Sequence, residues 1–394
     1  MPRAVISGNT AASYAAKLAR VRVVSAYPIT PQTTVVEKLA DFVASGDLDA
    51  QFVKVESEHS AMQVCISAAT LGARVYTATS SQGLLLMHEL LHWAAGARLP
   101  VVMGVVNRAV APPLSIWTDH TDSIAQRDTG WIQFYAESNQ ETLDTTLLAF
   151  RLAEHPDVRL PAMVMEDGFY LSHTVEPVDV PTQEEADRFL PDGPPPTGLR
   201  LGVAARMGSY TGPDLYTEFR HRVALGMAQA ADVLPEVEDA YRRVTGRHHG
   251  GALPTYRVDD ADAVLVTMGT ATTTARDVVD DLRSRGVKVG LAKLRVFRPF
   301  PVRALRALAA LVDRIGVLDR SFTFGAWGAA HAEVAAALYG ATRRALVRGY
   351  VAGLGGRDIT PATIEATFRS LLRRDGPETE WLDVKRREEV VRVG

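Results

Sequence analysis

Two spacings of apolar residues alternate along the first 180 residues of the chain. Short runs rich in β-branched residues are separated by longer segments in which apolar residues recur at helical spacing. The runs predict strands at residues 21–26, 51–55, 74–79, 100–106, 131–136 and 162–166. The segments between them predict helices near residues 10–20, 33–45, 57–71, 83–97, 123–129 and 140–155. This alternation is typical of a doubly wound α/β domain, in which a parallel sheet carries helices on both faces.

The pattern changes after residue 175. The run 191–196 (PDGPPP) can continue neither a helix nor a central strand, so we expect a connecting region with one helix near residues 215–240. A second α/β unit follows, with strands at residues 263–268, 288–294, 314–318 and 345–351. We therefore predict a first domain over residues 1–180, a linker region over 181–255, a second domain over 256–352 and a C-terminal loop and tail over 353–394.

The stretch 53–61 joins a predicted strand to a predicted helix. Ser57 can cap that helix, which places Glu58 in its first turn, where the helix dipole favours a carboxylate. The helix that follows is small and apolar on nearly every side, so we expect it to be buried. Glu58 is then either an ordinary acid at a helix start or a chemical group in a dry pocket. From this stretch alone the first interpretation is favoured.

Composition narrows the classes of function. The 394 residues carry a net charge of −3, which gives no electrostatic case for binding nucleic acid or an anionic membrane surface. No apolar run reaches transmembrane length and the N-terminus has no basic-apolar signal, so we expect a cytoplasmic protein. The one cysteine, Cys65, excludes an internal disulfide framework and any iron–sulfur cluster held by this chain alone.

Several polar loops should meet at one edge of the first sheet, because parallel sheets bind ligands beyond the carboxyl ends of their strands. These loops are residues 26–32, 56–60, 80–83 and 107–121. In the first of them two prolines stiffen the backbone, which suits holding the Thr30 hydroxyl toward a ligand. A plain strand-to-helix turn with Pro31 at the first helical position is an equally good interpretation of that loop by itself.

Several segments stand in the order that is found in one known family. They are Tyr27-Pro28-Ile29-Thr30-Pro31, Ser57-Glu58, Ser80-Ser81-Gln82-Gly83-Leu84-Leu85-Leu86-Met87, Asn107-Arg108-Ala109 and Ser115-Ile116-Trp117-Thr118-Asp119-His120. In the second half they are Lys293-Leu294-Arg295-Val296-Phe297-Arg298-Pro299-Phe300-Pro301, Leu318-Asp319-Arg320 and residues 353–361. Together, over almost the whole chain, these segments resemble the α subunit of 2-oxoacid:ferredoxin oxidoreductases, especially the pyruvate type.

The resemblance implies a thiamine diphosphate enzyme whose active site is divided between subunits. Residues 1–180 would be its pyrimidine-binding domain and residues 256–352 a transketolase-C-terminal-like domain. A β subunit would carry the diphosphate-binding domain with Mg²⁺, and [4Fe-4S] clusters would sit on the β and on further γ or δ subunits. The implied reaction is oxidative decarboxylation of a 2-oxoacid, pyruvate first, with coenzyme A as co-substrate. Its products are acyl-CoA, CO₂ and electrons for ferredoxin or flavodoxin, and the implied assembly is a hetero-oligomer with twofold symmetry.

The resemblance also gives roles to particular residues. Glu58 matches the carboxyl group that hydrogen-bonds N1′ of the aminopyrimidine and favours its imino tautomer, with Glu56 as the rival on the other side of the chain. Arg108 matches the arginine that binds the substrate carboxylate, with Thr30 assisting. Arg108 could instead form a surface ion pair or contact a partner subunit. The residues expected around the cofactor are Tyr27, Pro28, Ile29, Glu58, Ser81 and Gln82.

Some of these positions have other interpretations. Ser81 and Gln82 would also suit a tight turn, and Asp119 with His120 is a candidate acid–base pair. His88 and His92 lie one helical turn apart, but no third ligand accompanies them, so we expect no metal on this chain. The family has smaller residues where this chain has His59 and Ser60, and the loop after Arg108 is stiffened by prolines. A 2-oxoacid is therefore a firmer expectation than pyruvate itself.

Two further functions are compatible with the same sequence. One is a subunit of a non-redox thiamine diphosphate enzyme of the transketolase or carboligase kind. The other is a scaffolding subunit that keeps the interface with its partner but not the chemistry. Cysteines in the gene product encoded next to this chain would favour the redox enzyme, whereas loss of Glu58 or Arg108 would favour the scaffold, and both residues are present.

Overall fold

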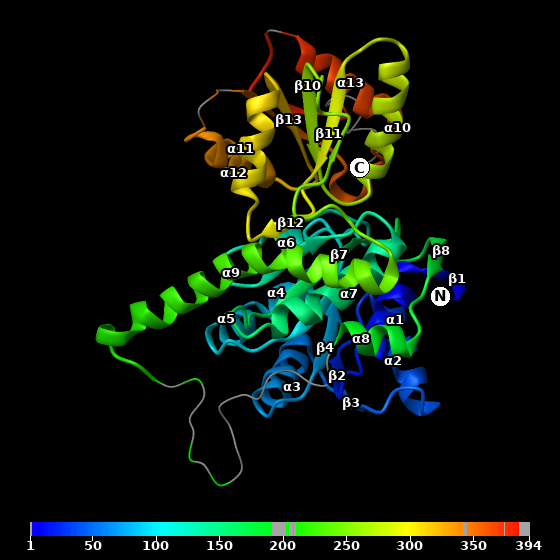
Figure 1. The fold of residues 1–394 in the computed structure, drawn as a ribbon, viewed down its shortest axis with the longest axis vertical. Coiled ribbons are helices and arrows are strands. Elements are labelled where there is room, and N and C mark those ends of the chain that lie inside the picture. Colours follow the sequence, from blue (N-terminus) through cyan, green and yellow to red (C-terminus); the bar gives the residue numbers. More distant parts are fainter. Residues whose placement is uncertain are drawn as a thin grey trace. The chain divides into compact units, whose positions relative to one another are not determined.

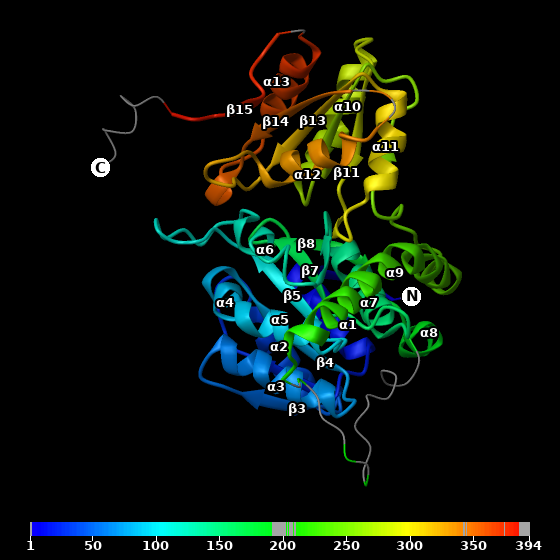
Figure 2. The same ribbon diagram turned by 90° about the vertical axis from the view of Figure 1, so that its left-hand side faces the viewer.

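The computed structural model describes residues 2–190, 202, 204, 208, 210–341, 343, 345–373 and 375–385. The chain divides into two compact units, Met1–Ala252 with Arg295–Pro301, and Leu253–Leu294 with Val302–Gly394 (Figures 1 and 2). The proline-rich run 191–196 and the last nine residues of the predicted tail, 386–394, lie outside the described residues. No helix in the described part of the chain is long and apolar enough to cross a membrane.

The first unit is built on a seven-stranded sheet with the order β12-β6-β7-β5-β4-β2-β3. Its strands are β2 (Val23–Ala26), β3 (Gln51–Lys54), β4 (Val75–Thr79), β5 (Val102–Asn107), β6 (Ile132–Tyr135), β7 (Ala162–Asp167) and β12 (Val296–Arg298). All neighbours pair in parallel except β12, which pairs antiparallel with β6. The predicted doubly wound fold and its six strands are confirmed. The strand β12 was missed because it returns from a distant part of the chain.

Helices cover the sheet where the apolar spacing predicts them, except that the helix predicted at 123–129 is a single short turn at residues 121–124. They are α1 (Gly8–Leu18), α2 (Thr33–Ala44), α3 (Glu58–Thr70), α4 (Ser81–Leu86), α5 (His88–Gly96), α6 (Thr121–Ile124) and α7 (Asn139–Glu154). Met87 between α4 and α5 keeps helical dihedral angles. The helix predicted at 83–97 is therefore nearly continuous, with an irregularity at Met87 that divides it into α4 and α5. An antiparallel ribbon of β1 (Arg3–Ser7) and β8 (Val175–Asp179) was not predicted.

The expected linker at 181–255 is wrong for the described residues 181–190 and 210–252, because they fold as part of the first unit. It contains α8 (Gln183–Phe189) and the 33-residue α9 (Pro213–Thr245), which begins with proline and ends before Gly246 in the left-handed conformation. Phe189 packs edge-on against Tyr241 at 4.9 Å between ring centroids. The helix predicted at 215–240 is confirmed, and its burial against α7 explains why it is not a connection in solvent.

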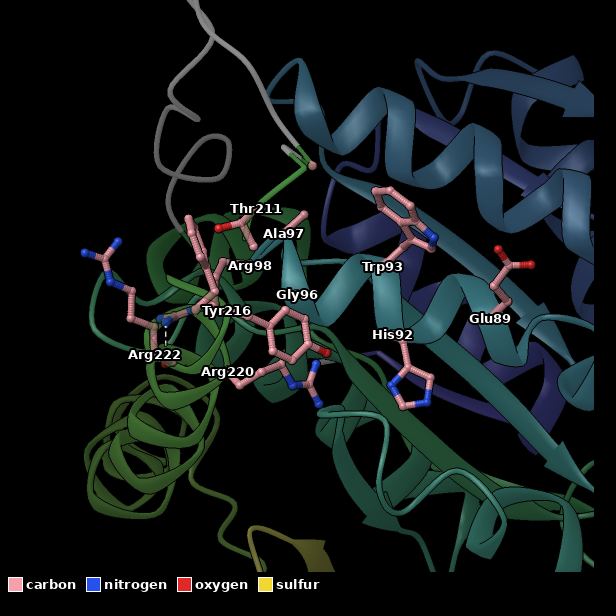
Figure 3. Close-up of a pocket in the computed structure, with 12 residues that line it drawn as sticks. Glu89, His92, Trp93, Gly96, Ala97, Arg98, Thr211, Tyr216, Arg220 and Arg222 are labelled. Carbon is pink, nitrogen blue, oxygen red and sulfur yellow. Dashed lines mark hydrogen bonds between the residues drawn. The ribbon is translucent and has the colours of Figure 1, made fainter. Parts of the chain in front are cut away.

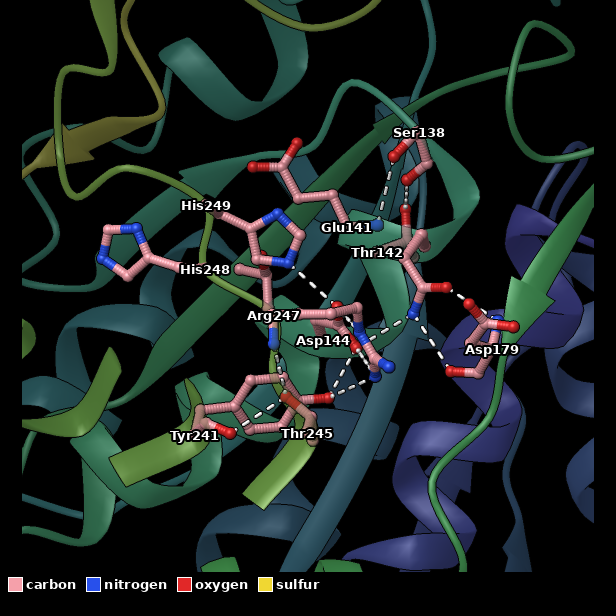
Figure 4. A network of polar contacts seen from close by, with 12 residues as sticks. Ser138, Glu141, Thr142, Asp144, Asp179, Tyr241, Thr245, Arg247, His248 and His249 are labelled. Atoms are coloured by element: carbon pink, nitrogen blue, oxygen red, sulfur yellow. Dashed lines mark hydrogen bonds and ion pairs between the residues drawn. The ribbon is translucent and has the colours of Figure 1, made fainter. Parts of the chain in front are cut away.

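A buried polar network holds the end of α9 on α7 (Figure 4). Asp144 accepts hydrogen bonds from Tyr241 Oη at 2.5 Å and from Arg247 Nε at 2.7 Å, and His249 Nε2 lies 2.9 Å from it. Burial raises the pKa of Asp144, but the bonds from His249 and Arg247 outweigh this effect, so that its pKa lies below the usual range. The network therefore fixes a charged carboxylate inside the first unit.

The second unit has a six-stranded sheet with the order β15-β14-β13-β10-β11-β9. Its strands are β9 (Thr255–Tyr256), β10 (Ala263–Thr267), β11 (Val289–Lys293), β13 (Arg314–Asp319), β14 (Leu346–Val351) and β15 (Thr379–Trp381). Its helices are α10 (Ala271–Ser284), α11 (Val302–Leu311), α12 (Ala329–Leu338), the short η1 (Leu354–Gly356) and α13 (Pro361–Leu372). The expected loop and tail at 353–394 is corrected, because α13 buries Ile364, Phe368 and Leu371 in the core.

Candidate active site

The strand order of the first unit changes direction twice, and both changes lie beside β4 and β5. The chain runs from β2 outward to β3 and then back across to β4, so β2 and β4 are neighbours with connections leading in opposite directions. A second change of direction separates β5 from β7. Loops diverge at such points and leave a crevice beyond the carboxyl ends of the strands. The predicted site residues follow β2, β3, β4 and β5 and are therefore brought to one edge.

The loop after β2 is tied to the rest of this edge through its backbone. Asn9 Nδ2 donates to the Pro31 carbonyl at 2.8 Å, and Gln32 Nε2 donates to the Ala78 carbonyl at the end of β4 at 2.9 Å. Tyr27, Pro28 and Thr30 are exposed and Ile29 is half-buried. A fixed backbone thus carries side chains that are open to an incoming group.

Glu58 is the first residue of α3, and Ser57 caps this helix by accepting a hydrogen bond from the Ser60 N–H. The Glu58 side chain is buried, and none of the described residues forms a hydrogen bond with its carboxylate. Glu56, the rival acid, is exposed, and its hydrogen bond from Ser60 lowers its pKa. A buried carboxylate without a partner is costly unless an outside donor completes it. Glu58 is therefore the acid that is suited to a ligand.

Gly83 on α4 makes room for this carboxylate. A Cβ atom at residue 83 would lie 2.5 Å from Glu58 Oε1 and 2.6 Å from Thr79 Oγ1. Thr79 Oγ1 is also buried and has no hydrogen-bond partner in the described chain. Two polar atoms without partners therefore adjoin a position that only glycine can fill. The sequence places Gly83 at the end of the loop 80–83 and at the start of the helix predicted at 83–97, but it does not indicate that Glu58 lies against it.

Arg108 follows β5 and reaches across to the loop after β2. Its Nη1 donates to the Thr30 carbonyl at 2.8 Å and its Nε donates to the Ser115 carbonyl at 3.2 Å. None of the described residues accepts a bond from Nη2, and burial lowers the pKa of this guanidinium. Arg108 thus contacts the backbone of Thr30, and the predicted role of the Thr30 hydroxyl toward a substrate stays a prediction. Nη2 is left to bind an outside acceptor.

Asp122 on α6 joins the loops after β4 and β5, and sequence reasoning missed it. Oδ2 accepts the backbone N–H of Ser81 at 2.9 Å and that of Arg108 at 3.1 Å. Oδ1 accepts Asn107 Nδ2 at 2.7 Å and the Ser123 N–H at 2.8 Å. Burial raises the pKa of Asp122 to about 7, and the bonds from Ser81, Asn107 and Arg108 oppose this rise. One carboxylate therefore bonds both loops and helps to fix their relative position.

We expect Asp122→Asn to lower the free energy of unfolding by about 3 kcal/mol. Each oxygen of Asp122 accepts two N–H groups, so either orientation of an amide turns its NH₂ group toward two donors. Urea unfolding of the purified chain measures the change. Asp128→Asn is the control, because Asp128 is exposed. Equal stability of the two variants would show that the carboxylate does not hold these loops.

The predicted acid–base pair of Asp119 and His120 is corrected, because the structure pairs His120 with a different acid. His120 Nε2 lies 2.8 Å from Asp167 Oδ1, and both side chains are buried. Asp119 Oδ1 accepts the Thr121 N–H at 2.9 Å, as an acid at the start of α6 does. Asp167 ends β7 and is far from His120 in sequence, so only the sheet order brings it there.

The other predicted residues have local contacts. Ser81 Oγ donates to the Ala109 carbonyl at 2.6 Å, which adds a second link between the loops after β4 and β5. His88 Nδ1 lies 2.6 Å from Gln126 Oε1, and its ring meets the His92 ring edge-on. Among the described residues no group of three or more His, Cys, Asp or Glu side chains could hold a metal ion.

Comparison with protein-family models identifies the family of this chain. Residues 14–239 match the thiamine diphosphate-binding domain of pyruvate flavodoxin/ferredoxin oxidoreductases, and residues 261–364 match core domain II of pyruvate:ferredoxin oxidoreductase. The chain belongs to the pyruvate flavodoxin/ferredoxin oxidoreductase family. Pyruvate synthase subunit PorA from Methanothermobacter thermautotrophicus is 47% identical over 98% of this chain and 99% of that protein. Ketoisovalerate oxidoreductase subunit VorA from Pyrococcus abyssi is 48% identical over 97% of this chain and 98% of that protein.

Two solved structures share the fold of this chain. The 2-oxoglutarate:ferredoxin oxidoreductase of Magnetococcus marinus, bound to 2-oxoglutarate, coenzyme A and succinyl-CoA, superposes with a TM-score of 0.73 at 18% identity. The match covers 94% of this chain and 65% of the Magnetococcus chain, so this chain spans less than two thirds of the length of that protein. A split-gene transketolase, an inactive β₄ tetramer, superposes with a TM-score of 0.55 at 12% identity over 94% of this chain and 99% of that one.

Proposed function

We propose that this chain is the α subunit of a thiamine diphosphate-dependent 2-oxoacid:ferredoxin oxidoreductase. The observation that carries the proposal is the buried Glu58 carboxylate, which has no partner in the described chain and lies against Gly83 at the switch point of the sheet. Family membership and the relatives named as subunits of pyruvate synthase and ketoisovalerate oxidoreductase support it.

The residues present fit the aminopyrimidine half of thiamine diphosphate. Glu58, which Gly83 leaves room for, would hydrogen-bond the ring nitrogen, and the loop Tyr27–Thr30 would receive the ring. When bound, this cofactor supplies a nucleophilic carbon and an electron sink for decarboxylation. Glu58 would hold a proton between its own oxygen and the ring nitrogen. Its burial keeps water from competing for that proton.

Arg108 would bind the substrate carboxylate. Two of its nitrogens are held by the Thr30 and Ser115 carbonyls, so the guanidinium plane is fixed before a substrate arrives and less entropy is lost on binding. Nη2 would donate to one carboxylate oxygen. Relatives named for pyruvate and for ketoisovalerate are 47% and 48% identical to this chain, so the proposal rests on the 2-oxoacid group and not on its side chain.

The remaining chemistry would lie on partner subunits in a cytoplasmic complex. Cys65 is fully buried, and burial raises the pKa of its thiol to about 12, so this thiol cannot act as a cluster ligand. The β subunit would supply the diphosphate site with Mg²⁺, and the iron–sulfur clusters would lie on the β and smaller subunits. Coenzyme A would accept the acyl group, and ferredoxin or flavodoxin would accept the electrons.

Turnover of the reconstituted complex tests the proposal. Pyruvate, 2-oxoisovalerate, 2-oxobutyrate and 2-oxoglutarate would each be supplied with coenzyme A and a low-potential dye as electron acceptor. We expect dye reduction that requires both coenzyme A and thiamine diphosphate with at least one of these acids. If none of these acids supports dye reduction and the complex instead catalyses carboligation of aldehydes, the proposal is overturned in favour of a non-redox thiamine enzyme.

We expect Arg108→Lys to lower kcat/KM for the 2-oxoacid about 30-fold, a loss of about 2 kcal/mol in transition-state binding, although the charge is kept. An ammonium group cannot bond the Thr30 and Ser115 carbonyls and a carboxylate in one plane. Steady-state kinetics of the complex measures the change, and Arg22→Lys, an exposed arginine beside Asp49, is the matched control. Equal kcat/KM for the two variants would remove Arg108 from the substrate site.

A further inference from the structure

A groove lies between α5 and the first turns of α9, outside the candidate active site (Figure 3). Its volume is about 610 Å³. Glu89, His92 and Trp93 of α5 form one wall, and residues of α9 such as Tyr216 and Phe219 form the other. Gly208 and Thr211, which precede α9, also line the groove, and Gly208 lies against the Trp93 ring. We call it the α5–α9 groove.

The wall formed by α9 is unusual for a helix of a folded unit. Every residue from Pro213 to Phe219 is exposed, and the inward side of the helix is buried only from Val223 onward. In Figure 1 this end of α9 projects away from the body of the first unit. The exposed fractions are 57% for Tyr216, 46% for Phe219 and 49% for Trp93 across the groove. Aromatic side chains gathered in this way mark a surface that another molecule covers.

The charges of the groove select the chemistry of that molecule. Arg98, Arg220 and Arg222 line it, against the one acid Glu89. Arg98 is used within the fold, since it donates to the carbonyls of Val158, Arg159 and Arg222. None of the described residues forms an ion pair with the side chain of Arg220 or Arg222. Arginine and aromatic residues without lysine are the composition of protein interfaces, and unpaired arginines favour an acidic partner.

The groove also adjoins the candidate active site. Glu89 lies at the edge of the groove, and its carboxylate is 3.8 Å from Nε2 of His59. His59 directly follows Glu58 in α3. A chain that covers the open side of Glu58 and supplies the rest of a divided active site would therefore reach the groove as well.

We propose that the α5–α9 groove is the docking surface for the partner subunit that completes the thiamine diphosphate site. The partner inserts an apolar side chain between Trp93 and Phe219 and sets aspartate or glutamate residues against Arg220 and Arg222. This assignment rests on the proposed function, which divides the site between two chains. A second copy of this chain fits less well, because an isologous contact would bring the unpaired arginines of both copies together.

Charge reversal at the groove tests the assignment. We expect Arg220→Glu with Arg222→Glu to raise the Kd for the purified partner subunit about 100-fold and to remove most of its salt dependence. The matched control is Arg242→Glu with Arg243→Glu, at the far end of the same helix, where both residues are exposed. Fluorescence anisotropy of the labelled partner gives Kd. Phe219→Ser, which leaves all charges in place, is expected to weaken binding as well.

Each outcome separates docking from catalysis. An unchanged Kd for the reversal and for Phe219→Ser would overturn the docking surface, even in a complex that oxidises 2-oxoacids. A wild-type complex without that activity, whose assembly the reversal still abolishes, would leave the docking surface in place and remove the proposed function. If the reversal alters only the self-association of this chain, measured by sedimentation, the groove is a contact between two copies and the assignment is wrong.

Discussion

Glu58→Gln is expected to reduce turnover of the complex by about 10²–10⁴-fold, the range contributed by a positioned acid or base. An amide cannot share a proton with a ring nitrogen as a carboxyl group does. Because no described residue bonds the Glu58 carboxylate, the substitution breaks no internal hydrogen bond, and we expect the fold and assembly to be unchanged. Exchange of the C2 proton of bound thiamine diphosphate, followed by NMR, measures the activation step without substrate.

Two further variants separate the chemistry of Glu58 from its surroundings. Glu56→Gln alters an exposed acid of the same loop and should exchange the C2 proton at the wild-type rate. Gly83→Ala keeps Glu58 but places a methyl group where Glu58 Oε1 and Thr79 Oγ1 now lie, and it should slow exchange by displacing the carboxylate. Wild-type exchange in Glu58→Gln, or slow exchange in Glu56→Gln, would assign the role to another group.

Local patterns were sufficient for the six parallel strands of the first sheet and for the placement of Glu58 at the start of α3. The serine cap and the acid in the first turn lie within one helical turn of each other, where capping rules apply. The apolar helix that follows is recognised from the spacing of its own residues. The burial of Glu58 and the exposure of Glu56 follow from the same start of α3. Spacing also located six strands, because β-branched runs between turn residues are read from neighbouring positions.

Contacts between distant segments could not be predicted in this way. Asp122 was overlooked because its four donors come from the start of α4, from the end of β5 and the residue after it, and from α6, and no local rule relates them. The same reason explains Asp167 as the partner of His120, and Gly83 as the neighbour of Glu58. The bond from Arg108 to the Thr30 carbonyl was likewise not predicted, because it joins loops that are far apart in the sequence. The general site was therefore predictable, and its supporting contacts were not.

Arg295→Met is expected to lower the free energy of unfolding of the first unit by about 3–5 kcal/mol. Arg295 is fully buried, and its guanidinium contacts Glu141 at 2.8 Å through Nε and Glu238 at 2.5 Å through Nη1. These acids lie on α7 and α9, so the arginine ties the segment that returns at residue 295 to both helices. Its removal leaves two carboxylates in the interior without their counter-ion, whereas a lost surface pair costs little.

Urea unfolding is monitored by hydrogen exchange of peptides from α7 and β6. These peptides report the stability of the first unit separately from that of the second. Arg242→Met, which removes an exposed arginine paired with Asp239 on α9, is the control and should change stability by less than about 1 kcal/mol. Adding Glu141→Gln and Glu238→Gln to Arg295→Met should restore part of the loss, because amides need no counter-ion. If the triple variant is less stable than Arg295→Met alone, packing of the arginine, and not its charge, holds the returning segment.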